Sequence, residues 1–326
     1  MNKVIGIGNA LVDVIIKLQD EEVLNMFSLP KGSMQLVDNK LALKIENETK
    51  GCETILSSGG SAANTIHGLA KLGIDTGFIG KIGHDNHGDF FRNDMLSAGI
   101  KPYISHGNDS TGRAITLVSP DSERTFATFL GSSDDLNDSD LQDIPFSNYS
   151  LLHVEGYLVQ NPKLFEKVLQ IAKLNGLKTS LDLSSYNIVS ENKKFLRDTM
   201  HHYIDIVFAN EEEAHAFTGK SPQDAVEELS LICNIAVVKT GSSGSIIQKG
   251  KEQSKIGVVN AQCIDTTGAG DLYAAGFLYG LSKNLPVSKC GKIGALLAAK
   301  VIEYLGAKIP ASGWNEIKKI KEAIEL

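Results

Sequence analysis

Short apolar runs rich in β-branched residues alternate along most of the chain with stretches of helical periodicity. The apolar runs predict strands near residues 4–7, 78–82, 151–154, 179–183, 204–209 and 235–239. The stretches between them predict helices near residues 64–72, 88–98, 162–175, 211–218 and 222–231. Such alternation is typical of a parallel sheet covered by helices on both faces. The pattern therefore predicts a three-layer α/β/α fold with a mostly parallel central sheet.

Three regions depart from this alternation. Residues 245–248 and 255–259, joined by a polar turn, predict an antiparallel hairpin at the sheet edge. Residues 14–57 show a mixed amphipathic pattern with no buried-strand run, and residues 111–130 show two strands of alternating polarity. Alternation of this kind suits a sheet with one solvated face. We expect one domain over residues 1–326, with a small β lid formed by the two insertions.

Composition narrows the classes of protein. The chain has 326 residues, of which 42% are hydrophobic, and a formal net charge of −7, so no basic surface indicates a nucleic-acid partner. No apolar run approaches the roughly 20 residues of a membrane span. The N-terminus begins directly with a strand-like run, and the four cysteines are far apart. Both features favour a cytoplasmic protein with reduced thiols.

The most informative stretch is Asp265-Thr266-Thr267-Gly268-Ala269-Gly270-Asp271, which runs into a helical pattern. Gly268, Ala269 and Gly270 can present backbone N–H groups at a helix N-terminus, a site for phosphate or a developing oxyanion. Asp271 would repel a bound phosphate, so its presence indicates a general base that deprotonates the attacking group. The alternative is an ordinary glycine-rich turn with a first-turn acid.

Candidate hydroxyl-binding residues occur near the N-terminus. Gly59 and Gly60 allow close approach of a ligand to the backbone, and Asn64 can both donate to and accept from a hydroxyl. Asn9 and Asp13 follow the first strand, where ligands of open α/β sheets bind. Their alternatives are a tight strand–helix turn and a dinucleotide-binding loop, and the latter lacks its third glycine.

Two further segments follow predicted strands and suit a nucleotide and its metal. Asn210 and Glu213 have the i, i+3 spacing of oxygen ligands for a hydrated Mg²⁺, although a helix N-terminus would show the same acids. The candidates for a nucleotide's phosphates or ribose are Lys239, Thr240, Gly241 and Gly244.

Other suggestive patterns do not carry a site. Gly219-Lys220-Ser221 resembles the end of a P-loop, but Ala214 stands where the motif requires glycine. The His84–His87 cluster lies in a polar turn, and His201 and His202 have no nearby third metal ligand.

Taken together, these segments resemble the PfkB family of ribokinase-like carbohydrate and nucleoside kinases over essentially the whole chain. The similarity rests on Gly59-Gly60 with Asn64, the Gly83-x-Asp85-x-x-Gly88 loop, Asn210-x-x-Glu213 and the 265–271 stretch. It implies an ATP-dependent kinase in which Asp271 is the base, residues 268–270 form the anion hole and Mg²⁺ lies near Glu213. It also implies acceptor binding by Asn9, Asp13, Gly60 and Asn64, and a monovalent cation such as K⁺ near Asp265 and Thr267.

Two segments near the N-terminus indicate the acceptor. The Asn9-x-x-x-Asp13 spacing and the long segment 22–38 resemble adenosine kinases, which favours a ribonucleoside phosphorylated on its 5′-hydroxyl. Arg124 is the candidate for a charged contact, and Phe129 or Met34 for a wall beside a purine base. The alternatives are a free-sugar kinase of the ribokinase or fructokinase type, a sugar-phosphate kinase using Arg113 and Arg124, and a non-catalytic nucleotide or sugar sensor. Edge strands of the lid suggest a homodimer.

Overall fold

The computed structural model describes residues 3–325, and within them the strands form two sheets. The nine-stranded main sheet has the order β14-β13-β12-β11-β10-β9-β1-β5-β6, and the five-stranded second sheet has the order β3-β8-β7-β2-β4 in the described residues. The strands of the main sheet are β1 (Lys3–Ile7), β5 (Asp75–Ile82), β6 (Lys101–His106), β9 (Leu151–Glu155), β10 (Lys178–Asp182), β11 (Ile206–Asn210), β12 (Ile235–Lys239), β13 (Ser245–Lys249) and β14 (Glu252–Ile256).

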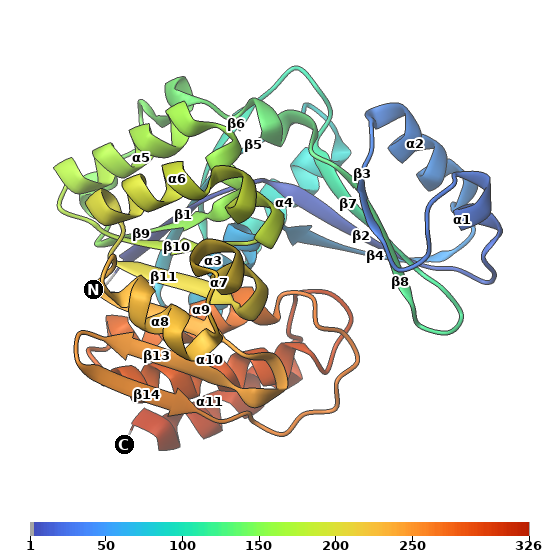
Figure 1. The fold of residues 1–326 in the computed structure, drawn as a ribbon. Helices are drawn as coiled ribbons and strands as arrows, with labels where there is room; N and C mark the ends of the chain where they lie inside the picture. Colours follow the sequence, from blue (N-terminus) through green and yellow to red (C-terminus); the bar gives the residue numbers. More distant parts are fainter. Residues whose placement is uncertain (1–2, 326) are drawn as a thin grey trace.

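Helices cover both faces of the main sheet (Figure 1). One layer contains α5 (Pro162–Leu174), α6 (Tyr186–Tyr203), α7 (Glu211–Thr218) and α8 (Pro222–Ser230). The other contains α3 (Ser61–Lys71), α4 (Asn86–Ser97), α9 (Ala269–Ser282), α10 (Val287–Val301) and α11 (Ala311–Glu325). Successive residues of β11 pack on opposite faces of the sheet, Val207 against the layer with α5 and Phe208 against the layer with α9. Because both faces are buried, the strand is a continuous apolar run. The predicted three-layer arrangement is confirmed.

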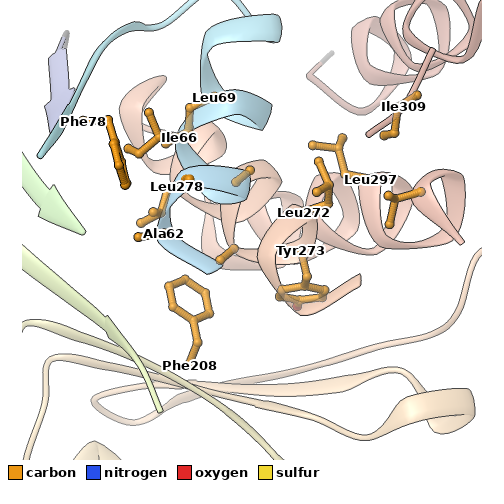
Figure 2. Packing of buried hydrophobic residues seen from close by; sticks show 14 of the residues in the cluster. Ala62, Ile66, Leu69, Phe78, Phe208, Leu272, Tyr273, Leu278, Leu297 and Ile309 are labelled. Atoms are coloured by element: carbon orange, nitrogen blue, oxygen red, sulfur yellow. The ribbon is translucent and has the colours of Figure 1, made fainter. Parts of the chain in front are cut away.

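One hydrophobic core lies between the main sheet and helices α3, α9 and α10 (Figure 2). Phe208 of β11 projects toward α9, and Ile66 of α3 lies on the same side of the sheet as Leu278 of α9. Each such fully buried side chain stabilises the fold by roughly 2 kcal/mol. Because α3 and α9 are packed together, their N-termini meet beside the carboxyl ends of the strands.

The second sheet stands beside the main sheet and carries two helices of its own (Figure 1). It contains β2 (Leu11–Lys17), β3 (Met34–Leu36), β4 (Glu53–Gly59), β7 (Gly112–Val118) and β8 (Arg124–Phe129), with α1 (Glu22–Met26) and α2 (Asn39–Glu48). The reading of residues 14–57 as free of a buried strand was wrong. Along β2 only Asp13 and Lys17 are not buried, because both faces of this strand are covered.

Two elements of the main body escaped the sequence pattern. β6 contains Pro102, which argues against an interior strand, but β6 is the edge of the main sheet, where a missing N–H is tolerated. Helix α6 is long but mostly polar, and Asn192 breaks its helical backbone. The hairpin is present, with its second strand at Glu252–Ile256 because the turn at Gly250 is tighter than expected.

Candidate active site

A cavity of about 610 Å³ lies at the carboxyl ends of β10, β11 and β12, beneath the second sheet. We call it the first cavity. Most of the residues singled out from the sequence line it: Asp13, Gly60, Asn64, Asn210, Glu213, Lys239, Gly241, Thr267, Gly270 and Asp271. Leu11, Asp13 and Ala114 come from the second sheet and the others from the main body. The wall is therefore divided between the two sheets.

Asp271, in the first turn of α9, is held by two side chains of α3. Its Oδ1 accepts a hydrogen bond from Ser61 Oγ at 2.7 Å, and its Oδ2 accepts one from Asn64 Nδ2 at 3.0 Å. Burial raises the pKa of Asp271 to about 6, although these hydrogen bonds and Lys239 favour the ionised form. A carboxylate with a pKa just below neutrality is suited to accept a proton from a hydroxyl.

The loop before α9 is fixed through Asp265, which is 3% exposed. Its Oδ1 accepts from Thr267 N at 2.9 Å and from Thr267 Oγ1 at 2.7 Å, and its Oδ2 accepts from Gly306 N at 2.8 Å. Gly268, in the left-handed region, precedes the helix. These hydrogen bonds hold the loop in one conformation where it joins the N-terminus of α9. The first backbone amides of that helix have no intrahelical acceptor.

The turn at Gly60 forms another part of the wall of the first cavity. Gly60 has a φ of 100°, and a β-carbon there would lie 2.1 Å from Asn9 O, so only glycine fits. Beside it, burial raises the pKa of Asp13 to about 7, against the lowering effect of Lys308. Asn9 and Gly59 support this turn but do not line the cavity.

Two supporting residues were not found from the sequence. Glu155, fully buried at the end of β9, accepts from Asn9 N at 2.8 Å and Ala62 N at 3.0 Å, so it joins the turn to α3. Lys308 Nζ donates to Asn64 Oδ1 at 3.2 Å, which fixes the orientation of the Asn64 amide toward Asp271. The sequence signal for Glu155 is its place at the end of a predicted strand, whereas nothing local marks Lys308.

Asn210 and Glu213 form a capping box at the start of α7. Asn210 Oδ1 accepts from Glu213 N at 2.8 Å, and the Glu213 carboxylate accepts from Asn210 N and Nδ2. Burial raises the pKa of Glu213 to about 7, despite the nearby Lys239. The carboxylates that line the cavity are Asp13, Asp182, Glu211, Glu212, Glu213 and Asp271. Carboxylate oxygens are the ligands that a divalent cation such as Mg²⁺ prefers, and a hydrated Mg²⁺ needs only one or two of them.

A second cavity of about 450 Å³ adjoins the first, and the two share Gly241. Its lining includes the predicted residues Gly244 and Ala269 and is largely apolar, with Val258, Ala298 and Ile302 among its residues. Thr240 N donates to Gly244 O at 2.8 Å and closes the turn between the cavities. A flat aromatic group would suit the second cavity, with a polar extension reaching into the first.

The structure does not bring Arg124 or Phe129 to either cavity. The Arg124 guanidinium pairs with Asp265 at 3.2 Å and donates to Ile264 O, so Asp265 already has a cationic partner. Phe129 is buried with the Arg113 guanidinium 5.1 Å from its ring centroid. Arg113 in turn donates to Glu46 at 2.8 Å.

Strand register explains why Phe129 lies elsewhere. Ala114, which lines the first cavity, pairs with Thr128 of β8, and side chains alternate between faces along a strand. Phe126 and Thr128 therefore share the cavity face, while Phe129 lies on the other. Met34 pairs with Phe126, and it joins the cavity face at the far edge of the second sheet.

His84 stacks on His106 with ring centroids 4.4 Å apart. In the described residues, no group of three or more His, Cys, Asp or Glu side chains is arranged to hold a metal. None of the helices described here has the length and apolar character needed to cross a membrane.

Comparisons with known proteins agree with this architecture. A family model described as pfkB family carbohydrate kinase matches residues 32–313. The adenosine kinase of Sinorhizobium meliloti has a similar structure, with a TM-score of 0.87, 32% identity, and coverage of 98% of this chain and 99% of that one. A probable sugar kinase of Rhizobium etli gives a TM-score of 0.88 at 30% identity, with 98% of each chain covered. The 5-dehydro-2-deoxygluconokinase of Bacillus subtilis is 29% identical over 285 residues, covering 81% of this chain and 86% of its own.

Fold and matches together define the class, a phosphotransferase that acts on an alcohol group. The chain belongs to the pfkB family of carbohydrate kinases. The ribokinase-like fold and the kinase class predicted from the sequence are therefore confirmed.

Proposed function

We propose that this protein transfers the γ-phosphate of ATP to a primary hydroxyl of a neutral nucleoside, the 5′-hydroxyl of adenosine or a related ribonucleoside. The observation that carries the transfer step is the position of Asp271 in the first turn of α9, where Ser61 and Asn64 of α3 donate hydrogen bonds to its carboxylate. Its carboxylate takes the hydroxyl proton as the acceptor oxygen bonds to the γ-phosphorus and the bond to the ADP oxygen breaks. The amides of residues 268–270 stabilise the charge on the transferred group.

ATP fits the pair of cavities in one direction. Its base would occupy the apolar second cavity, and its phosphates would pass Gly241 toward the start of α9. Mg²⁺, held near Glu213, would neutralise phosphate charge among the carboxylates of the first cavity. The second sheet would act as a lid that excludes water from the transfer.

A neutral acceptor is supported by the charges of the cavity. The arginines that could bind a sugar phosphate do not line the cavity, since Arg113 pairs with Glu46 and Arg124 pairs with Asp265. Asp13 and Asp271 would repel a second negative charge but can accept hydrogen bonds from hydroxyls.

A nucleoside rather than a small sugar is supported by the cavity face of the second sheet. Leu11 and Ala114 line the cavity, and Phe126 and Met34 extend the same face. An apolar face can cover a purine base, which offers a larger flat apolar surface than a small free sugar does. The free-sugar alternative keeps some support, because one structural relative is described as a probable sugar kinase.

The acceptor assignment is tested by ATP turnover with adenosine, inosine, ribose, fructose and fructose phosphate. We expect the highest kcat/KM with a nucleoside and no turnover of fructose phosphate. Phe126→Ala should lower kcat/KM for the nucleoside by roughly tenfold, the effect of losing an apolar contact, and leave ribose turnover nearly unchanged. Highest kcat/KM with a free sugar would overturn the nucleoside assignment.

The base assignment is tested by Asp271→Asn. This change should lower kcat by roughly 10²- to 10⁴-fold while ATP binding is retained, because a general base acts on the acceptor. A variant with near-normal kcat would contradict the role of Asp271.

A further inference from the structure

A buried ion pair lies at the wall of the first cavity, and it joins Lys239, one of the phosphate-binding candidates from the sequence, to Asp182. Lys239 Nζ lies 2.8 Å from Asp182 Oδ2, and the two side chains are 15% and 5% exposed. Lys239 ends β12 and Asp182 ends β10, so both reach the cavity from the carboxyl edge of the main sheet. Among the described residues that line this cavity, Lys239 carries the only ammonium group.

The ammonium group lies against the start of α9. A β-carbon added to Gly270 would lie only 3.0 Å from Lys239 Nζ, so the ammonium group lies directly against the first turn of α9. The positive end of a helix dipole attracts anions and repels cations. A lysine at this place therefore needs a counter-anion, and in the structure Asp182 supplies it.

Asp182 is itself fixed in place. Its Oδ1 accepts a hydrogen bond from Ser184 N at 3.1 Å, and Ser184 has a φ of 63°, unusual for a residue other than glycine. The Ser184 backbone thus holds this carboxylate in place while the carboxylate pairs with Lys239.

We propose that Lys239 binds the transferred phosphoryl group and that Asp182 is its counter-ion in the unliganded protein, exchanged for phosphate oxygens when the donor binds. This inference rests on the proposed kinase function. Lys239 then adds a charged contact to the backbone amides around the group being transferred. Because Lys239 must leave Asp182, the exchange lowers donor affinity relative to a free lysine.

Substitutions of Lys239 and of Asp182 should therefore have opposite effects on the affinity for the phosphate donor. Removing the lysine deletes a phosphate contact and weakens binding of a triphosphate. Removing the charge of Asp182 frees the lysine and therefore strengthens binding of the triphosphate. A pair that served only the stability of the fold would weaken binding in both cases.

The experiment measures dissociation constants of ADP and of the β,γ-methylene analogue of ATP by titration calorimetry, in EDTA so that metal binding does not contribute. Asp182→Asn should bind the analogue roughly tenfold more tightly than wild type, and Lys239→Met roughly tenfold more weakly, the scale of a charge-assisted contact. ADP, which lacks the γ-phosphate, should change less than the analogue in both variants. Lys239→Arg should retain most of the affinity.

Controls separate this role from a general loss of stability. Lys239→Met combined with Asp182→Asn removes both charges, so it should fold and bind the analogue as weakly as Lys239→Met. The matched control is Lys81→Met, which breaks a similarly buried pair, Lys81–Asp140 at 3.0 Å, away from both cavities. It should leave both dissociation constants unchanged.

Weaker binding of the analogue by Asp182→Asn, or equal losses for ADP and the analogue in Lys239→Met, would overturn the inference while the kinase function stands. If wild-type protein neither bound the analogue nor turned over any acceptor, the proposed function itself would fail.

Discussion

At the scale of single residues, Lys308 illustrates how a side chain outside the cavity can control the chemistry within it. Burial lowers the pKa of Lys308 to about 8, so it is mostly protonated at neutral pH. It donates to Asn64, which donates to Asp271. Lys308 therefore orients the Asn64 amide toward the proposed base, Asp271, and places a positive charge near it.

The pH dependence of activity should report this contact. In wild type, the acid limb of kcat/KM should fall near pH 6, the pKa of Asp271, because the base must be deprotonated. Lys308→Met should move that limb upward by roughly one pH unit, since loss of a nearby positive charge favours the protonated carboxyl. Lys308→Arg should restore the wild-type limb, and an unshifted limb in Lys308→Met would contradict the role.

At the scale of elements, the loop at Asp85 joins helix α4 to the root of strand β7. Asp85 Oδ1 accepts from Gly88 N at 2.8 Å and Thr111 Oγ1 at 2.7 Å, and its Oδ2 accepts from Thr111 N at 2.7 Å. The Asp85 carboxylate thus caps α4 and holds the start of β7, where the chain returns to the second sheet.

Replacing Asp85 should be costly for this reason. Asp85→Ala should lower the free energy of unfolding by about 2 to 4 kcal/mol, the combined effect of a lost N-cap and lost hydrogen bonds to Thr111. Denaturant unfolding measures this loss. The control is Asp89→Ala, which removes an exposed carboxylate from the first turn of the same helix. An equal effect in both variants would show that the hydrogen bonds of Asp85 have no special role.

Elements with a strong local pattern were predictable, and contacts between distant segments were not. The buried strands and helix α7 follow from periodicity and capping, and Asp271 with its glycines forms a short local motif. Lys308 and Asn64 are 244 residues apart, and Glu155 lies 146 residues from Asn9, so only the folded topology joins them. The face of β8 on which Phe129 lies could not be predicted, because it depends on strand register, which the sequence leaves open.

At the scale of the whole molecule, buried acids are concentrated around one cavity. Burial raises the pKa values of Asp13 and Glu155 to about 7. A folded-state pKa above the unfolded value favours folding below the unfolded pKa. That stabilisation is lost as pH rises through the folded pKa. As pH rises from about 4 to 7, these carboxyls therefore make the unliganded fold progressively less stable, and the loss of stability persists above pH 7.

Glu155→Gln tests this charge effect. Relative to wild type, the melting temperature of the variant should rise from pH 5 to about pH 7 and then level off, because glutamine cannot ionise as Glu155 does. Comparison at each pH cancels other titrating groups, such as His153, whose pKa burial lowers to about 4. Calorimetry at several pH values gives the difference, and a constant difference would contradict a raised pKa at Glu155.

The division of the cavity wall between two sheets has an evolutionary consequence. The second sheet is encoded by two contiguous segments, residues 11–59 and 112–129, whereas Asp271 and Lys239 lie in the main body. Mutation or recombination within those segments can change the surface that meets the acceptor and leave the transfer machinery intact. We expect new acceptor preferences to arise in this lineage mainly by such exchanges, and a laboratory chimera that imports both segments from a relative should acquire the preference of the donor of those segments.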